Sequence, residues 1–110
     1  MTLEEHSVTT DDGYVLKMFR VTHDSFANKT KAPVLFMHGV DDSADCWIIN
    51  EAESAPAFVA ARSGYDVWLG NWRGNKYSRK HLTLDPNQNA KEFFDFSWTD
   101  MSKHDFPAFI

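Results

Sequence analysis

A strand–helix–strand succession over residues 33–71 constrains the fold more than any other feature of this sequence. PVLFMHG is a short continuous apolar run, as in a strand buried on both faces. SAPAFVAARSG then predicts a helix that Ser54 caps, that holds Pro56 in its first turn and that Gly64 ends. YDVWLGN supplies a second strand. We expect these two strands to be parallel, with a right-handed crossover between them.

A β-hairpin is expected before this unit. Two β-prone runs in HSVTTDDGYVLKMFRV flank Asp11-Asp12-Gly13, and Asp-Gly is a strong hairpin signal. In the second run, Tyr14, Leu16 and Met18 alternate with Val15, Lys17 and Phe19, as in a strand with two different faces. A hairpin followed by a βαβ unit predicts an α/β sheet. A sheet of so few strands leaves both of its faces in need of cover. We therefore expect residues 1–110 to be the first part of a larger domain.

The pattern changes after Gly70. Residues 71–96 are polar and irregular, which predicts a long surface loop, functional or packed on itself. A helical pattern then begins, and two starts fit it. Ser97 could cap the helix with Asp100 in the first turn, or the helix could begin near Asp105 with Pro107 inside its first turn.

Composition excludes several classes of function. The formal net charge of -5 leaves no basic footprint for nucleic acid. The longest apolar stretch, APVLFM, is far too short for a transmembrane segment. MTLEEHSV is acidic and polar, unlike a secretory signal peptide, so either the chain stays inside the cell or a preceding segment is missing from it. Asn28 begins a glycosylation sequon, and an unmodified loop asparagine is the simpler interpretation.

The segment GNWRGN, residues 70–75, has the G-x-S-x-G frame of a hydrolase nucleophile elbow with Trp72 in the place of serine. An elbow needs a strand, a sharp turn and then a helix. NKYSRKHLTLDP lacks helical apolar periodicity, and Trp72 has no nucleophilic atom. We therefore interpret Gly70 and Gly74 as turn residues where a strand leaves the sheet.

His38-Gly39-Val40 is the second candidate, at the end of a predicted buried strand. In α/β-hydrolases an H-G turn after such a strand presents a backbone N–H to the oxyanion of the reaction. Glycine lets the chain turn close to a substrate. A histidine and a glycine at a strand end are also an ordinary structural turn, and for the dipeptide alone this is the favoured interpretation.

Other polar groups carry weaker signals. Spacing singles out no catalytic triad among the five histidines His6, His23, His38, His81 and His104. The basic run 78–81 is expected to be a solvated loop rather than a site. Solvent is also the expected environment of the cations Arg73, Arg79 and Lys80, with an anionic partner as the alternative. Asp100, His104 and Asp105 have helical spacing but lack a fourth ligand for a metal site. Cys46, the single cysteine, is expected to pack as a small residue, and nearby aspartates would disfavour its thiolate. The aromatic residues Phe93, Phe94, Phe96 and Trp98 are expected to be core or loop anchors.

Three blocks together resemble the acid lipases, the α/β-hydrolase family of lysosomal acid lipase and gastric lipase. VTTDDGYVLKMFRV is similar to the family's N-terminal hairpin, and VLFMHGVDDSADCWIIN to its oxyanion strand and loop. SGYDVWLGNWRGNKYSRKH and FFDFSWTDMSKHDFPAFI resemble the next strand, loop and helix start. The resemblance covers nearly the whole chain in order, and its most specific block is YDVWLGN-x-RGN.

This resemblance implies the N-terminal portion of an enzyme that cleaves lipid esters, such as triacylglycerols or steryl esters, through a serine acyl-enzyme and without a cofactor. Val40 matches the residue whose backbone N–H forms half of the oxyanion hole, and His38 and Gly39 form the supporting turn. The family's nucleophile, acid and triad histidine match no residue here and are expected beyond Ile110. The family is often secreted or lysosomal, and commonly has a small polar residue in the place of Trp72.

Two hypotheses follow. In the first, the chain is part of a lipid-ester hydrolase and is inactive alone. In the second, it is a non-catalytic paralogue or one part of a split enzyme, whose open sheet is covered by a partner.

Overall fold

The computed structural model describes residues 1–24 and 31–110, and the sequon at Asn28 lies outside these ranges. The strands are β1 (Thr2–Thr9), β2 (Tyr14–Thr22), β3 (Pro33–Phe36), β4 (Asp66–Gly70) and β5 (Lys80–His81). The helical elements are η2 (Ala44–Trp47), α1 (Pro56–Arg62), α2 (Ala90–Phe93), α3 (Trp98–Asp100), η3 (Met101–Asp105) and α4 (Phe106–Phe109). In this part of the chain no helix is long and apolar enough to cross a membrane.

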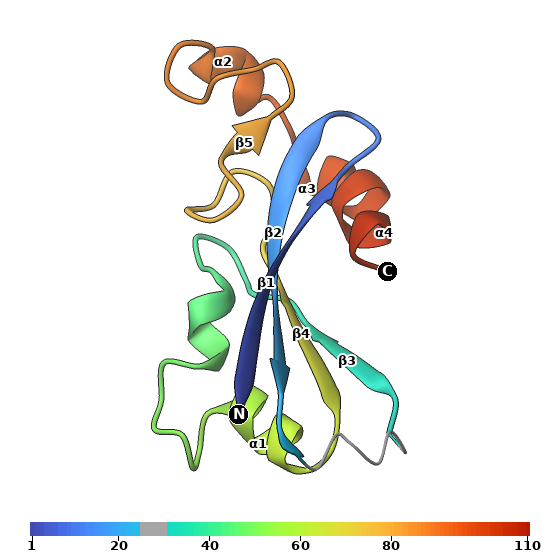
Figure 1. Ribbon diagram of the computed structural model, residues 1–110. Helices are drawn as coiled ribbons and strands as arrows, with labels where there is room; N and C mark the ends of the chain where they lie inside the picture. The colour runs from blue at the N-terminus through green and yellow to red at the C-terminus, as the bar shows by residue number, and fades with distance from the viewer. Residues whose placement is uncertain (25–30) are drawn as a thin grey trace.

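One mixed sheet organises the chain, with the strand order β1-β2-β4-β3 and β5 paired to β2 (Figure 1). β3 and β4 are parallel, as the strand–helix–strand pattern predicted. β2 runs antiparallel to both β1 and β4, so it joins the hairpin to the βαβ unit. The predicted α/β-hydrolase type of sheet is therefore present, with α1 between its parallel strands in sequence.

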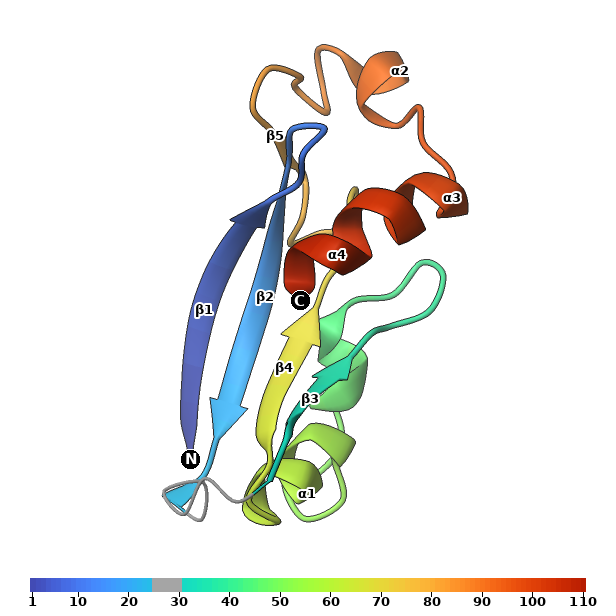
Figure 2. The same ribbon diagram turned by 90° about the vertical axis from the view of Figure 1, so that its right-hand side faces the viewer.

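The two faces of the sheet carry separate apolar clusters. On one face, Val21, Val67 and Leu69 pack against Ala57 and Ala61 of α1. On the other face, Leu16 and Tyr14 pack with Phe93, and Phe109 of α4 lies against them. Figure 2 shows the C-terminal helix on the side of the sheet opposite α1. Both faces are thus covered near the middle of β2, as a sheet with apolar residues on both sides requires.

The predicted hairpin is confirmed. β1 and β2 pair from Thr2–Thr22 to Thr9–Val15, and the turn between them places Gly13 at φ +99°. A side chain is rarely accommodated at this φ, which is the physical reason for glycine in the Asp-Gly signal. The alternation of β2 is also confirmed, since Tyr14, Leu16 and Met18 are buried while their neighbours are half-exposed.

The helix between the parallel strands has a different start from the one predicted. Ala55 is the N-cap residue and Pro56 is the first helical residue, whereas the Ser54 hydroxyl donates to the Glu51 carbonyl instead of capping the helix. The prediction of Ser54 as cap was wrong because Pro56 already fixes the first turn and has no N–H that needs a cap. The predicted end is confirmed, since Gly64 follows the helix at φ +93°.

The C-terminal helix follows the first of the two predicted starts. The Ser97 backbone N–H donates to the Asp100 carboxylate over 2.8 Å, and helical residues run from there to Phe109 through the π-helical η3. The Phe106 N–H bonds the Met101 carbonyl, five residues earlier. Because Pro107 has no N–H and its ring crowds the preceding turn, this wider turn lets the helix pass through it.

Residues 71–96 are a loop with two short elements that the sequence did not predict. β5 pairs with Tyr14 and Val15 of β2, and α2 is a single turn that buries Phe93. Residues 71–79 contain no helix, which confirms that GNWRGN is not followed by the helix of a nucleophile elbow. The expectation that 78–81 is a solvated loop was wrong in part, because Ser78 is fully buried and Lys80–His81 form β5. Arg79 and Lys80 are exposed, as expected.

Candidate functional site

The His38-Gly39-Val40 turn lines a hollow of about 940 Å³ that lies beyond the ends of β3 and β4. The turn follows the last residues of β3 directly, so a strand of the sheet fixes its base. The other walls come from the loop after β4 and from residues before and within α3, among them Trp72, Asn75, Phe94 and Trp98. The predicted oxyanion turn and the GNWRGN segment therefore meet at one site.

His38 is buried, and each of its ring nitrogens has a partner. Its Nε2 accepts the Trp72 backbone N–H over 3.2 Å and lies 3.1 Å from the Asn75 amide nitrogen. Its Nδ1 lies 2.8 Å from the Gly39 carbonyl oxygen, which can only accept. This arrangement satisfies a neutral imidazole with its proton on Nδ1. Since both nitrogens are occupied by the surrounding backbone and amide groups, His38 is a structural residue of the turn and not a catalytic base.

Trp72 holds the same turn through a second bond. Its indole Nε1–H donates to the His38 carbonyl oxygen over 3.0 Å, while its backbone N–H donates to the His38 ring. The residue in the serine place of the G-x-S-x-G frame thus binds a neighbouring loop. The prediction of a structural loop signature is in agreement with these contacts.

Val40 is at the exposed tip of the turn, with 68% of its surface accessible. Among the described residues none accepts a hydrogen bond from its backbone N–H. Gly39, beside it, has open space where a Cβ would lie. An unused backbone donor therefore lies beside the hollow, next to a glycine that leaves room for a ligand.

Three polar residues whose role the sequence did not reveal hold the surrounding loops together, and Asn71 and Ser78 among them are fully buried. The Asn71 amide oxygen accepts the Ala44 N–H over 2.9 Å, and its amide nitrogen donates to the Lys17 carbonyl over 3.0 Å. Asn75 donates to the Asn71 oxygen over 2.8 Å. Ser78 donates to the Asn71 carbonyl over 2.9 Å. The spacing of these residues after a strand gave no signal, because their partners lie in three different segments.

Arg73 was expected in solvent or against an anionic partner, and this prediction was wrong. Its residue surface is 3% exposed, and its guanidinium lies 3.9 Å from the Tyr14 ring centroid. Two N–H groups bind Asp12 over 2.7 and 2.9 Å, and Nε binds Asp105 over 2.8 Å. The Arg73 backbone N–H also donates to Asp105 over 2.9 Å. The arginine therefore connects the hairpin turn to the C-terminal helix through two carboxylates.

The two carboxylates respond differently to this environment. Burial favours the neutral form of Asp12, but hydrogen bonds from Arg73 and Thr10 outweigh it and hold the pKa of Asp12 below its ordinary value of 3.8. At Asp105, which is fully buried, burial is the dominant influence and raises the pKa despite the bonds from Arg73.

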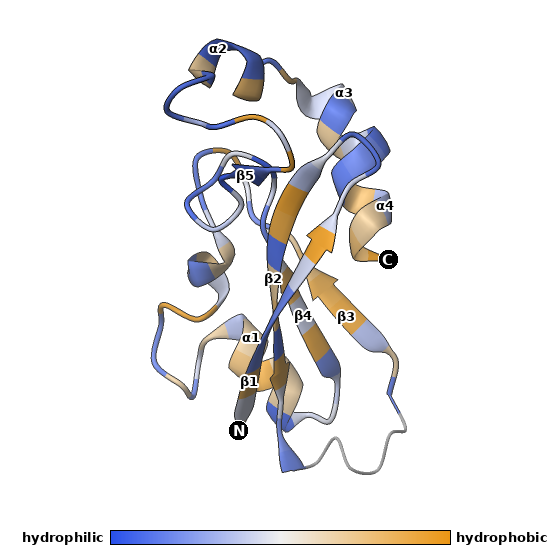
Figure 3. Cartoon of the chain, turned by 45° about the horizontal axis from the view of Figure 1, so that its top comes forward, coloured by the Kyte–Doolittle hydropathy of each residue, from blue (hydrophilic) through white to orange (hydrophobic). Residues whose placement is uncertain are grey.

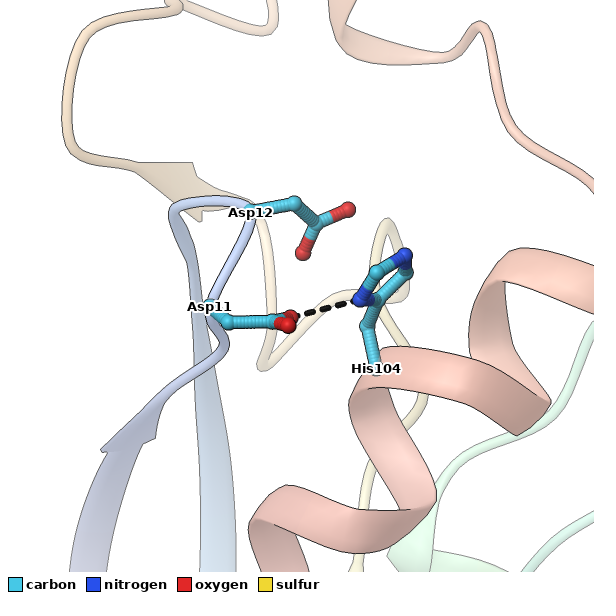
Figure 4. A group of neighbouring side chains, drawn as sticks. All are labelled: Asp11, Asp12 and His104. Carbon is cyan, nitrogen blue, oxygen red and sulfur yellow. Dashed lines mark hydrogen bonds and ion pairs between the residues drawn. The ribbon is translucent and has the colours of Figure 1, made fainter.

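Asp100, His104 and Asp105 do not form a common site, because each contacts a different segment. Asp100 binds the Ser97 N–H, Asp105 binds Arg73, and His104 Nδ1 lies 2.5 Å from the Asp11 carboxylate. Figure 4 shows His104 facing Asp11 and Asp12 in the hairpin turn. Asp12 already accepts the Arg73 guanidinium and the Thr10 hydroxyl, so this group is a hydrogen-bonded network between turn and helix.

The remaining sequence candidates have mixed outcomes. Cys46 is half-exposed on the wall of the hollow, where burial and then Asp42 raise the pKa of its thiol, in agreement with the expected disfavoured thiolate. Phe93 is core, as expected. Phe94 and Trp98 are 41% and 55% exposed and line the hollow, so they are not core residues. Phe94 instead contacts the rings of Phe93 and Phe96, in agreement with the alternative that it anchors the loop.

Comparison with known proteins shows which proteins this chain is similar to. The family described as the partial alpha/beta-hydrolase lipase region matches residues 1–51, which include the turn at His38–Val40. Lipase member K from Homo sapiens is 47% identical over 110 residues, which is 97% of this chain and 27% of that protein. Lipase lipl-1 from Caenorhabditis elegans is 43% identical over 96% of this chain and 26% of its own length. The tear acid lipase-like protein of Mesocricetus auratus is 43% identical over 99% of this chain and 28% of its own length.

The chain spans about a quarter of the length of these curated relatives. The likeness extends from β1 through the C-terminal helix, so it covers the hairpin, the oxyanion-type turn and the GNWRGN loop alike. By sequence and by its sheet, this chain belongs to the acid-lipase family of α/β-hydrolases.

Proposed function

We propose that the chain forms part of a lipase that hydrolyses lipid esters, such as triacylglycerols or steryl esters, through a serine acyl-enzyme. The observation that carries the proposal is the His38-Gly39-Val40 turn, which follows β3 and leaves the Val40 N–H without an acceptor among the described residues. In ester hydrolysis negative charge develops on the carbonyl oxygen, and a fixed backbone N–H stabilises that charge.

Val40 supplies one half of the oxyanion hole in this proposal. The other half, the serine nucleophile, the acid and the triad histidine come from residues outside this chain. The exposed apolar side chains along the hollow, Val40, Ile49, Phe94 and Trp98, give an ester with a hydrocarbon tail an apolar surface to lie against. The isolated chain is inactive, because a donor without a nucleophile gives only part of the catalytic machinery.

The test uses the chain alone and a completed chimera, in which residues 1–110 replace the matching segment of human lipase member K. The isolated chain should neither turn over a short-chain fatty ester nor be labelled by a fluorophosphonate, while the completed chimera should do both. Replacing the Val40 backbone N–H by an ester oxygen should lower kcat of the chimera about 10²- to 10³-fold, the size of one lost oxyanion donor.

Serine-type turnover by the isolated chain would show that the inactivity claim is wrong. An unchanged kcat in the chimera that lacks the Val40 N–H would remove the oxyanion role of this turn. The matched control replaces the backbone N–H of Ile49, which lines the same hollow away from the turn, by an ester oxygen. The control should leave kcat within about twofold, since no oxyanion donor is lost.

A second candidate function follows from the open edge of the sheet. Within residues 1–24 and 31–110, β3 ends the strand order and pairs only with β4. We propose, as the alternative, a non-catalytic interaction module or one part of a split enzyme, in which a separate chain adds strands at this edge. The test is co-purification of the chain with such a partner in a stable complex. A complex without esterase activity would favour the interaction module, and a complex with esterase activity would favour the split enzyme.

A further inference from the structure

We propose that Trp72 and His38 act together as positioning residues that aim the Val40 backbone N–H. The inference deepens the proposed function, because it rests on Val40 as an oxyanion donor. Packing does not hold this donor in place: Gly39 has no atom near the position of a Cβ, and Val40 is 68% exposed. Hydrogen bonds to the two peptide groups before the donor therefore have to supply its orientation.

The first step concerns the peptide group between Gly39 and Val40. A trans peptide is planar, and its C=O and N–H point in opposite directions. Within the described residues every peptide bond is trans. His38 Nδ1 lies 2.8 Å from the Gly39 carbonyl oxygen. A bond that holds this carbonyl also fixes the direction of the Val40 N–H on the opposite side of the same plane.

The second step concerns the proton on the His38 ring, because only a protonated Nδ1 can donate to Gly39. Asn75 Oδ1 accepts the Tyr77 and Ser78 N–H groups, each over 3.0 Å, which orients the Asn75 amide so that its nitrogen faces His38. His38 Nε2 therefore meets two donors, the Asn75 amide and the Trp72 backbone N–H. With Nε2 as acceptor, the neutral ring carries its proton on Nδ1.

The third step concerns the preceding peptide group, between His38 and Gly39. The Trp72 indole Nε1–H holds the His38 carbonyl oxygen over 3.0 Å. Trp72 thus acts twice, on the carbonyl directly and on the proton of the ring through its backbone. Both planes that lead into the Val40 N–H are restrained, although glycine between them would otherwise turn freely.

The experiment removes one hydrogen bond and keeps the shape of the side chain. Trp72 is replaced by 3-benzothienylalanine, which has sulfur in place of the indole N–H, and the same replacement at Trp68, on β4 and outside the hollow, is the matched control. In the completed chimera the Trp72 replacement should lower kcat roughly three- to tenfold, the effect of one lost neutral hydrogen bond, with KM unchanged. The Trp68 replacement should change neither constant.

NMR of the 110-residue chain supplies a readout that would not change if Trp72 only supported the fold. The ¹⁵N signals of His38 should report the Nδ1–H tautomer, and the Val40 amide should have an order parameter near the rigid value of about 0.85. The Trp72 replacement should lower that order parameter while the Trp68 replacement leaves it unchanged.

Three outcomes separate this inference from the function on which it rests. Two outcomes would overturn the inference and leave the oxyanion role intact. One is a Nε2–H tautomer of His38, and the other is a Val40 order parameter and a kcat that do not change on replacement of Trp72. A third outcome, a chimera whose kcat is unchanged on loss of the Val40 N–H, would overturn the proposed function. The NMR result would still decide whether Trp72 orders the turn.

Discussion

Single residues of GNWRGN each bind a different part of the molecule. Asn71 binds β2 and the first residue of η2, Trp72 binds the His38 turn, and Arg73 binds both the hairpin turn and the C-terminal helix. Gly74 has φ +85°, and a Cβ there would lie 2.8 Å from the Phe96 ring. The segment is therefore a junction, and its tolerance to substitution should follow from what each side chain binds.

Loss of the Arg73 guanidinium should strongly destabilise the chain. Arg73→Leu leaves Asp105, which is fully buried, without its counterion, and removal of one partner from a buried ion pair costs about 3–5 kcal/mol. Urea unfolding followed by circular dichroism measures the change. Arg79→Leu, at an exposed arginine on the same loop, is the control and should change the free energy of unfolding by less than about 0.5 kcal/mol. Equal effects of both substitutions would contradict the assigned role of Arg73.

Acid should destabilise the chain through Asp12. Its folded pKa lies below 3.8, so its contribution to the free energy of unfolding is present above that value and is lost as pH falls through the folded pKa. The raised pKa of Asp105 has the opposite sign, since its contribution is lost as pH rises. Urea unfolding should be measured from about pH 6 to about pH 2.5. Over this range the free energy of unfolding should fall less in Asp12→Asn than in the wild type.

Asp95→Asn provides the control for the acid experiment, because Asp95 is an exposed carboxylate on the loop before α3. In this variant the free energy of unfolding should fall on acidification as much as in the wild type. If Asp12→Asn lost stability on acidification as steeply as Asp95→Asn, the Arg73 contact would not be the source of the effect.

At the scale of elements, β2 changes its partner along its length. It pairs with β5 at Tyr14–Val15 and with β4 at Met18–Val21. Between these ladders the Lys17 N–H donates to the Ser78 hydroxyl over 3.0 Å, and the Lys17 carbonyl accepts the Asn71 amide over 3.0 Å. Two side chains from the loop thus replace a missing strand, because buried backbone groups need partners.

Ser78→Ala should therefore weaken the centre of β2. The substitution leaves the Lys17 N–H without its acceptor at a fully buried site, which costs about 1–3 kcal/mol. Hydrogen exchange of the Lys17 amide should accelerate, and the urea midpoint should fall. Ser7→Ala, at an exposed position of β1, should leave both measurements unchanged. Retained protection of the Lys17 amide in Ser78→Ala would contradict this account of the gap.

At the scale of the whole molecule, the chain is elongated and its sheet is open. Its principal extents are 44 × 25 × 21 Å, and its radius of gyration is 15.0 Å. A compact domain of this length would have about 13 Å. The two edges differ, because β1 carries Glu4, Glu5 and His6, whereas β3 reads PVLF. Figure 3 shows the apolar colouring of β3 and β4. Charged residues protect an edge from pairing, so β3 is the unprotected edge.

The isolated chain should therefore self-associate through β3 as its concentration rises. Leu35→Lys places a charge in this strand and should reduce the association, as measured by sedimentation velocity. Leu3→Lys, at a 61% exposed position of β1, is the control and should associate like the wild type. Circular dichroism checks that both variants are folded. A wild-type chain that stays monomeric at every concentration would contradict the prediction.

Local signals predicted much of the fold. The hairpin, the alternation of β2, the parallel strands and the end of α1 all follow from turn residues and apolar periodicity, which act over a few neighbours. The start of α1 was wrong by one residue, since Pro56 removed the need for the Ser54 cap. The short elements β5 and α2 were missed because each depends on contacts with β2 or with Tyr14, distant in sequence.

For the site, the sequence by itself offered the His38-Gly39-Val40 turn as a candidate, which stays a prediction, and excluded an elbow at Trp72, because both depend on residue types beside a strand end. The tertiary structure alone decided what holds the turn. His38 and Trp72 are 34 residues apart, and Arg73 and Asp105 are 32 apart. Neither pair has a periodic or motif signal, since hydrogen bonds between loops depend on where the sheet brings those loops together and not on spacing along the chain.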